Sequence, residues 1–379
     1  MRGSGSGGNP LGNCVRRGVP MKTVRVGIVG AGFVAELHAE SFARIPNAEV
    51  TAVASRTEER ARAFAERFHI PRVFTSYEEL VRSPDVDMIT VACPNDLHAP
   101  VTIAAARAGK HVVCEKPLCM NLDEADQMIE ACRAAGVKLM YAEELCFAPK
   151  YVRAKTLVHE GALGDVYMVR QGECHYGPHS DWFWDINRSG GGVLMDMGCH
   201  SIEFARWIYD YRPVEAVYAS LGRYVHRERT RGEDNSICIL RFEGGPIAIA
   251  ENSWARTGGI DDFAEIYGSK GLTIANLIRG NALLTYSDVG YGYAVEKAPR
   301  TTGWTFTSFE EMWNYGFPQE MQHFVDCVAE DKQPRITGEN GRAVLEIICA
   351  AYESARTGRE VRLPFRPQVR KPIDCWLGS

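Results

Sequence analysis

The sequence lacks three features that would assign it to a membrane, nucleic-acid-binding or disulfide-rich class. No apolar run approaches the ~20 residues that a helix needs to cross a bilayer. Lys and Arg form no basic block, and the net charge of −5 at pH 7 argues against nucleic acid and membranes as partners. The twelve cysteines are scattered and contain no Cys-x-x-Cys pair. We therefore predict reduced, mostly buried thiols in a cytoplasmic protein.

The first twenty residues differ from the rest of the chain. They are rich in Gly and Ser and contain no apolar segment of a secretory signal. We interpret residues 1–20 as a tag or a disordered extension, with the natural start at Met21. The length of 379 residues predicts two domains. We place a dinucleotide-binding domain at 21–143, a substrate-binding and oligomerisation domain at 144–366, and a tail at 367–379.

A glycine-rich turn follows the first apolar stretch. Residues 24–29 run into Gly-Ala-Gly-Phe-Val-Ala at 30–35, and a helical pattern follows. Gly30 permits a tight turn, Gly32 lets the backbone approach a pyrophosphate, and the helix N-terminus offers N–H groups to phosphates. We expect Gly30, Gly32, Phe33 and Val34 to bind a dinucleotide. A purely structural strand–helix turn is the alternative.

Strand and helix patterns alternate from the first strand, at 24–29, to residue 144. The predicted strands cover 48–56, 86–94, 110–117 and 137–144, and the predicted helices cover 57–68, 98–109 and 122–136. This alternation is typical of an α/β fold with a doubly wound parallel sheet, the Rossmann arrangement. Ligands bind beyond the carboxyl ends of such strands. The further cofactor contacts that we predict there are Pro94, Asn95, His98, Glu115 and Lys116.

The end of the second strand bears on the choice of cofactor. A carboxylate at this point would bind the ribose 2′-hydroxyl of NAD, but the chain has Ser55 and Arg56 and no acid. Both side chains suit a 2′-phosphate. We predict NAD(P) as the cofactor and favour NADP. NAD stays open, because Arg56 can also stack on adenine or point to solvent.

The second half has the alternating pattern of an antiparallel sheet. The predicted strands lie at 165–176, 214–224, 235–242 and 247–256, with a hairpin at 264–276 and a turn at 244–245. Helices are predicted at 318–330 and 341–357. We expect an open, mostly antiparallel sheet with one face packed on helices. The uncovered face predicts a homodimer or a homotetramer.

One predicted helix, at 189–210, carries candidate catalytic residues. Asp196 and His200 are four residues apart, so they would share one face of this helix. Histidine suits proton transfer near neutral pH, and a neighbouring carboxylate can fix its tautomer. A surface pair or a hydrogen-bonded core histidine is the alternative.

Aromatic and polar residues mix in the segment 174–185. Such a mixture suits a sugar, which offers apolar C–H faces and many hydroxyls. The residues concerned are His175, Tyr176, Trp182 and Trp184. A loop that caps the core is the alternative. A zinc site from Cys174, His175, His179, Cys199 and His200 matches no familiar ligand spacing, so we expect no metal.

Five motifs in residues 23–364 together resemble the Gfo/Idh/MocA oxidoreductases, which include inositol and sugar dehydrogenases. The motifs are VGIVGAGFVAELHA, ACPNDLHAPVTIAAARAGKHVVCEKPL, LMYAEELCFAPKY, GGVLMDMGCHSIEFARWI and EIYGSKG. The resemblance implies a nucleotide-binding domain followed by an α/β domain with an open sheet, commonly used for dimers or tetramers.

The resemblance also implies roles for individual residues. Lys116 matches the lysine beside the nicotinamide and the reacting hydroxyl, His200 matches the usual acid/base, and Asp196 matches its helical partner. The chain departs from the family at 146–147, where Cys-Phe replaces the frequent Arg-Phe, so we expect unusual substrate contacts from this strand. The complete set of predicted substrate contacts is Lys116, Glu144, His175, Tyr176, Trp182, Trp184, Asp196 and His200.

These features predict an NAD(P)-dependent enzyme that acts on a sugar, a glycoside or a cyclic polyol. Hydride would pass between nicotinamide and a hydroxyl-bearing carbon, while His200 takes the hydroxyl proton and Lys116 stabilises the oxygen. One alternative is an enzyme with a tightly bound, recycled cofactor that assists glycosidic cleavage or another redox-neutral step. A catalytically silent sensor is a further alternative, against which the intact Lys116, Asp196 and His200 argue.

Overall fold

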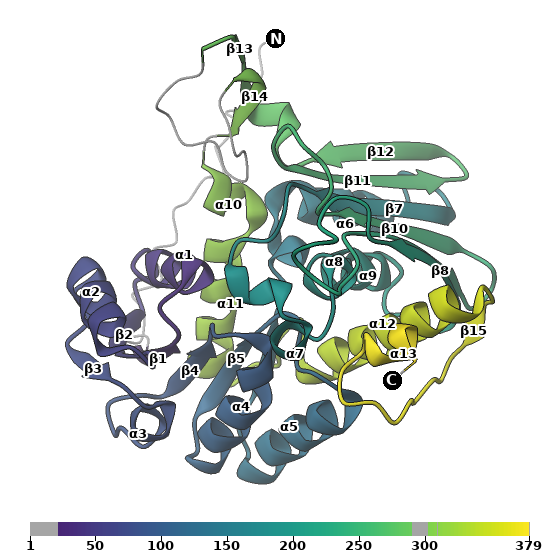
Figure 1. Ribbon diagram of the computed structural model, residues 1–379. Coiled ribbons are helices and arrows are strands. Elements are labelled where there is room, and N and C mark those ends of the chain that lie inside the picture. The colour runs from purple at the N-terminus through teal and green to yellow at the C-terminus, as the bar shows by residue number, and fades with distance from the viewer. Residues whose placement is uncertain (1–21, 290–301, 309, 379) are drawn as a thin grey trace, which may run out of the picture.

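The computed structural model describes residues 22–289, 302–308 and 310–378. The N-terminal extension, the predicted start at Met21 and Cys14 lie outside the described residues. Two large sheets, of six and seven strands, organise the chain, and helices pack around both of them (Figure 1). The predicted α/β class is confirmed.

The first sheet is entirely parallel, with the order β3-β2-β1-β4-β5-β6. Its strands are β1 Val24–Val29, β2 Ala48–Ala54, β3 Arg72–Phe74, β4 Met88–Val91, β5 His111–Glu115 and β6 Leu139–Ala142. The central strands are almost wholly apolar and buried, because helices cover both faces of such a sheet. The predicted doubly wound Rossmann sheet is confirmed.

Five helices connect these strands. They are α1 Phe33–Phe42, α2 Glu58–Phe68, α3 Tyr77–Val81, α4 His98–Arg107 and α5 Leu122–Ala135. The sequence marks both ends of α5. Asn121 accepts a hydrogen bond from the backbone N–H of Glu124 at 2.9 Å, and Gly136 ends the helix in the left-handed conformation.

The second sheet is mixed but mostly antiparallel, with the order β12-β11-β7-β10-β9-β8-β15. Its strands are β7 Val166–Cys174, β8 Val214–Gly222, β9 Asn235–Phe242, β10 Ile247–Ser253, β11 Asp261–Gly268, β12 Gly271–Asn276 and β15 Val361–Arg362. Only the β7–β10 pair of this sheet is parallel. The predicted turn at 244–245 joins β9 to β10, and both glycines there have positive φ. A separate hairpin contains β13 Ala282–Ser287 and β14 Gly303–Ser308.

One face of the second sheet carries exposed apolar side chains, which we call the open sheet face. Cross-strand register places its residues on the same side, opposite the face that α9 (Gly198–Ile208) and α12 (Gly338–Thr357) cover. These side chains, between 39% and 65% exposed, are Tyr218, Ile237, Ile239, Leu272 and Ile274. Exposed apolar side chains on one face of a sheet are typical of a contact surface.

Two late helices join the halves of the molecule. Helix α11, Phe317–Ala329, packs against α1 and β1, beside which it lies in Figure 1. Helix α12, Gly338–Thr357, contacts α5 and β6 of the first half and α9 and β8 of the second. Three further helices are α6 Pro149–His159, α10 Glu311–Tyr315 and α13 Asp374–Leu377.

The prediction of one continuous helix over 189–210 is wrong. The segment contains parts of three helices: α7 Ile186–Ser189, α8 Val193–Asp196 and α9 Gly198–Ile208. In a continuous helix the N–H of His200 would bond the carbonyl of Asp196. Instead it bonds the carbonyl of Met197 at 3.1 Å, while Lys116 Nζ donates to the Asp196 carbonyl. Asp196 and His200 therefore lie on two short helices that meet at Met197.

The predictions about membrane-spanning segments and about the cysteines can be compared with the described part of the chain. There, no helix has both the length and the apolar character that crossing a bilayer requires. The described cysteines are free thiols, and all except Cys93 are buried.

Candidate active site

A cavity of about 1490 Å³ lies at the carboxyl ends of the first sheet, where segments of the second half close over it. We call it the central cavity. It brings together most of the residues that we predicted from the sequence. These are Gly30, Gly32, Phe33, Val34, Ser55, Arg56, Pro94, Asn95, His98, Glu115, Lys116, Glu144, Trp182, Asp196 and His200.

The glycine-rich turn has the geometry of a phosphate cradle. Gly30 has φ of +125°, and a Cβ atom there would lie 1.9 Å from the carbonyl oxygen of Ala92. Gly32 caps α1 without any side-chain hydrogen bond, and a Cβ atom there would meet nothing within 4 Å. Residues 30–34 line the cavity, and the open space beside Gly32 leaves room at the N-terminus of α1 for the pyrophosphate of a dinucleotide.

The part of the cavity wall that follows β2 carries two cations. Ser55 and Arg56 line it directly after β2, and Arg60 lines it from the first turn of α2. We did not predict Arg60, although a cation one helical turn after Arg56 was a readable signal. Glu78 of α3 also lines the cavity, and its carboxylate accepts a hydrogen bond from Ser76 Oγ.

Lys116 is held by Asp196 and remains an ammonium. Its Nζ donates to the backbone oxygen and to Oδ1 of Asp196, both at 3.1 Å, and Trp254 Nε1 donates to Oδ2 at 3.2 Å. Burial by itself lowers the pKa of Lys116. The charges of Asp196 and of neighbouring acids outweigh this effect and raise the pKa well above its ordinary value. The side chain of Lys116 is 14% exposed, so its charge faces the cavity.

A chain of buried polar contacts supports the lysine from behind. The backbone N–H of Lys116 donates to Glu115 Oε2 at 3.0 Å, and Glu115 Oε1 lies 2.8 Å from His38 Nε2. His38 Nδ1 lies 2.7 Å from Thr90 Oγ1. Burial raises the pKa of Glu115, but the hydrogen bond and charge of His38 and the charge of Lys116 lower it overall. We did not predict His38, which reads as a polar residue on the buried face of α1.

His98 and Asn95 fix the loops around the cavity. His98 Nδ1 lies 2.9 Å from the carbonyl oxygen of Pro117, and Nε2 lies 2.8 Å from that of Cys93. The ring thus ties the end of β4 to the end of β5. Asn95 Nδ2 donates to the carbonyl of Ser189 at 2.8 Å, which connects the first half to α7.

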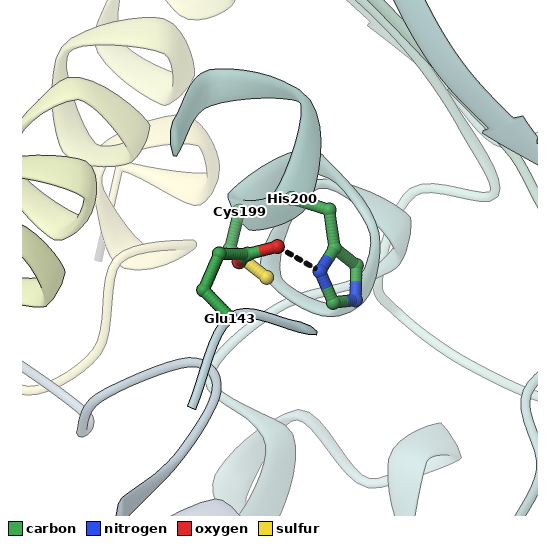
Figure 2. A group of neighbouring side chains, drawn as sticks. All are labelled: Glu143, Cys199 and His200. Atoms are coloured by element: carbon green, nitrogen blue, oxygen red, sulfur yellow. Dashed lines mark hydrogen bonds and ion pairs between the residues drawn. The ribbon is translucent and has the colours of Figure 1, made fainter. Parts of the chain in front are cut away.

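His200 forms a buried pair with Glu143, which Figure 2 shows. Its Nδ1 lies 2.6 Å from Glu143 Oε1, and its Nε2 lies 3.8 Å from Oε1 of Glu144, which lines the cavity. Burial lowers the pKa of His200, and burial together with Glu203 raises that of Glu143 well above its usual range. We did not predict Glu143 as a site residue, although two adjacent acids at the end of an apolar strand were a signal.

The same figure includes Cys199, because single atoms of Glu143, Cys199 and His200 lie within 4.8 Å of one another. Such a group could in principle bind a metal. Burial, however, raises the pKa of the Cys199 thiol well above its ordinary value, and Sγ donates to the carbonyl of Asp196 at 3.2 Å. A structural zinc site uses four ligands and thiolate sulfur. We therefore interpret the group as a hydrogen-bonded cluster.

Three predicted substrate contacts lie outside the cavity wall. His175 is fully buried, with Nδ1 2.6 Å from the carbonyl oxygen of Gly177 and Nε2 3.2 Å from Met197 Sδ. The rings of Tyr176 and Trp184 pack on His226, at centroid distances of 4.8 and 4.9 Å. For these three residues, the arrangement agrees with the alternative of a loop that caps the core.

Other residues of this segment do line the cavity. Trp182 stacks on Phe183 at 3.8 Å, and His179 stacks on Phe33 of the glycine-rich turn at 4.3 Å. Glu173, at the end of β7, lines the cavity and is buried. We did not predict Glu173, which directly precedes the segment that we singled out.

Comparison with known proteins gives two family matches. Residues 24–143 match the family described as "Oxidoreductase family, NAD-binding Rossmann fold" (GFO_IDH_MocA). Residues 151–274 match the GFO/IDH/MocA C-terminal domain. The two matches follow one another along the chain and cover both sheets.

Individual relatives match over nearly their full length. Myo-inositol 2-dehydrogenase of Thermotoga maritima is 29% identical over 342 residues, which cover 90% of this chain and 98% of the relative. 1,5-Anhydro-D-fructose reductase of Ensifer adhaerens is 31% identical over 341 residues, covering 89% and 98%. Among solved structures, GenD2 from gentamicin A biosynthesis, in complex with NAD, is 32% identical with a TM-score of 0.86, covering 93% and 99%.

Proposed function

Because the chain belongs to the Gfo/Idh/MocA family of NAD-binding oxidoreductases, we propose that it is a dehydrogenase of sugars, glycosides or cyclic polyols. The supporting observation is that Lys116, Asp196 and His200 meet on the wall of the cavity that also contains the glycine-rich turn. Two relatives, an inositol dehydrogenase and an anhydrofructose reductase, are named for substrates of this chemical class. We assign the cofactor to residues 21–143 and the substrate to 144–366.

The reaction divides between cofactor and side chains. A bound nicotinamide cofactor supplies the two-electron redox chemistry. In the oxidation direction, neutral His200 donates Nδ1–H to Glu143 and accepts the substrate hydroxyl proton at Nε2. The Lys116 ammonium donates a hydrogen bond to the same substrate oxygen and stabilises its developing negative charge.

Two carboxylates position these groups. Asp196 binds Lys116 through both its backbone oxygen and its carboxylate, which directs the ammonium toward the cavity. Glu143 holds the imidazole ring of His200 in one orientation and stabilises the imidazolium that forms when the proton arrives. Glu143 is thus a positioning residue for the proton transfer.

Within this function, we propose a preference for NADP over NAD. Two cations, Arg56 and Arg60, line the end of the cavity that follows β2, and no acid directly follows the strand. Guanidinium groups bind phosphate strongly through paired N–H donors. A ribose 2′-phosphate would therefore meet complementary charge at this end.

We also propose that the protein forms a homodimer or homotetramer through the open sheet face. The five apolar side chains lie on one side of the sheet in two groups, one on β8 and β9 and one on β12. The ion-paired Arg170, Glu251 and Glu265 lie between the two groups on the same side. Covering the two apolar groups with a second copy would remove apolar surface from water, which stabilises association by roughly 25 cal/mol per Å².

The function is tested by following cofactor absorbance at about 340 nm with NAD or NADP and a panel of sugars, glycosides and inositols. We expect the reduced-cofactor band to grow with one substrate class, and the rate to fall at least ~10²-fold in His200→Ala. No growth, with nucleotide released from the denatured protein, would instead identify an enzyme with a tightly held, recycled cofactor. No growth and no bound nucleotide would refute both proposals.

A further inference from the structure

Trp254 lies behind the wall of the central cavity rather than in it. The residue directly follows β10, is fully buried and forms a small apolar cluster with Val193 and Met197. The rings of Phe183 and Trp184 pack edge to face against the indole, at centroid distances of 6.4 and 5.5 Å. Phe183 and Met197 line the cavity, whereas Trp254 does not. The indole is therefore held in one orientation beneath the wall, without contacting the space that a substrate would occupy.

Hydrogen bonds hold both the backbone and the indole nitrogen of Trp254. The backbone N–H donates to the carbonyl of Asp234 at 2.8 Å, and the backbone oxygen lies 3.0 Å from His226 Nε2. Nε1 carries the one polar hydrogen of the side chain, and it donates to Oδ2 of Asp196 at 3.2 Å. The other carboxylate oxygen of Asp196, Oδ1, accepts from Lys116 Nζ at 3.1 Å. Two different donors thus hold the two oxygens of one buried carboxylate.

The hydrogen bonds of Lys116 leave one donor for the substrate. An ammonium group has three N–H donors. One of them donates to the backbone oxygen of Asp196 and a second to Oδ1 of the same residue, both at 3.1 Å. The third N–H is available to a ligand, because Lys116 lines the central cavity. In the proposed reaction, this N–H stabilises the substrate oxygen.

The carboxylate of Asp196 needs both contacts to keep its orientation. Rotation about the last side-chain bond of an aspartate is only weakly restrained, so the rotamer alone does not fix which oxygen faces which donor. Without the indole N–H, Oδ2 would be a buried acceptor that has lost its donor, which costs free energy. Lys116 is the basic side chain that forms an ion pair with Asp196, at 3.1 Å. The carboxylate would therefore turn until Oδ2 also accepted from the ammonium, and the third N–H would no longer face the substrate.

We propose that Trp254 is a positioning residue for the reaction, whose indole N–H holds Oδ2 of Asp196 and so keeps one N–H of Lys116 free for the substrate oxygen. This inference rests on the proposed dehydrogenase function and adds to it a residue that contacts neither cofactor nor substrate. The side chain does not itself react. It fixes Asp196, Asp196 fixes Lys116, and Lys116 stabilises the oxygen from which His200 takes the proton.

Trp254→Phe tests this role, because it removes the N–H and retains an aromatic ring. We expect kcat for substrate oxidation to fall about tenfold, as for the loss of one hydrogen bond to a charged group, and the Kd for the cofactor to be unchanged. Trp207→Phe is the matched control and should retain the wild-type kcat, since Trp207 of α9 is also buried and packs on Phe204. A wild-type kcat in Trp254→Phe would overturn the inference and leave the dehydrogenase function intact. If the wild-type enzyme reduced no cofactor with any sugar, glycoside or inositol, the function and the inference would both be overturned.

The double variant with Lys116→Ala distinguishes positioning of the lysine from support of the fold. Rates are measured as single turnovers with enzyme in excess, so that slow variants can be compared. If Trp254 acts through the lysine, Trp254→Phe lowers the rate in the wild-type background but not in Lys116→Ala. An equal fold-loss in both backgrounds would show a purely structural role and refute the proposal.

Trp254→His provides a comparison that does not depend on the stability of the phenylalanine variant. Its ring is smaller and packs less well, but it retains an N–H donor. We expect its kcat to exceed that of Trp254→Phe, because the donor and not the apolar area positions Asp196. The reverse order would contradict the proposal.

Discussion

The buried pair of Glu143 and His200 leads to a quantitative prediction for Glu143→Gln. The 2.6 Å contact is fully buried, and it becomes charge-assisted when His200 takes up the substrate proton. A hydrogen bond to a charged group contributes about 1.5–3 kcal/mol. At about 1.36 kcal/mol per tenfold change in rate, kcat for substrate oxidation should fall about 10- to 160-fold.

The dependence of kcat on pH distinguishes a role of Glu143 in proton transfer from a purely structural role. When Glu143 is protonated, it donates to Nδ1, and Nε2 of His200 then carries the ring hydrogen and cannot accept a proton. Burial raises the pKa of Glu143. We therefore expect kcat for oxidation to be low at low pH and to rise with pH as the Glu143–His200 pair loses the proton of Glu143. The amide of Glu143→Gln has no such proton to lose. In this variant, kcat should fall only at the lower pH at which His200 itself becomes protonated, because burial lowers the pKa of His200.

The assay is kcat for oxidation measured across the pH range, with saturating cofactor and substrate. Glu233→Gln is the matched control, because it also converts a buried carboxyl group to an amide. Glu233 Oε1 accepts from the backbone N–H of Leu194 and from the hydroxyl of Tyr352, both at 2.9 Å, and none of these contacts involves His200. We expect the control to keep the wild-type inflection. A wild-type kcat and inflection in Glu143→Gln would refute the role of the pair.

Three further predictions concern separate parts of the molecule. Lys116→Ala should lower kcat at least ~10²-fold and retain cofactor binding, measured by nucleotide fluorescence, because the lysine acts on the substrate oxygen. Cofactor that no longer binds would contradict this. Arg56→Ala should raise the Kd for NADP about tenfold and leave that for NAD nearly unchanged in calorimetry; equal effects on both would refute the 2′-phosphate contact. Ile239→Asp, on the open sheet face, should shift the mass measured by light scattering to that of a monomer, whereas an unchanged mass would exclude this face as the interface.

The fold could be predicted largely because its two sheets have different sequence patterns. Strands such as β4, buried on both faces, are continuous apolar runs, whereas β9 alternates between buried and exposed residues. Both patterns are local, so they can be read without knowledge of distant partners. The pairing of β7 with β10, by contrast, is parallel and joins residues about 80 positions apart, and no local pattern predicts it.

The break in the predicted helix at 189–210 has a similar cause. The local pattern is helical on both sides of Met197, but the Asp196 carbonyl bonds Lys116, which lies 80 residues earlier in the chain. This tertiary contact replaces a helical hydrogen bond. The local sequence does not predict this contact, because Lys116 lies at the end of another strand.

The place of a candidate site residue in the fold can be predicted where its position along a strand fixes the location of its side chain. The ends of β1, β2, β4 and β5 all border the cavity, so residues directly after these strands line it. His175 and Trp184 differ, because their rings turn toward Met197 and Trp254 inside the second half. His38 was missed because its importance depends on Thr90 and Glu115, partners that are distant in sequence.

The late position of α11 and α12 has a consequence for the synthesis of this protein. The last strand of the first sheet ends at Ala142, yet helices that pack against this half of the molecule end only at Ala329 and Thr357. During translation, the nucleotide-binding half therefore emerges about 215 residues (142 to 357) before its own packing is complete, a span that includes the whole of β7 to β12. We expect it to reach its final, protease-resistant state only after the second half has been made, and the two halves to unfold together.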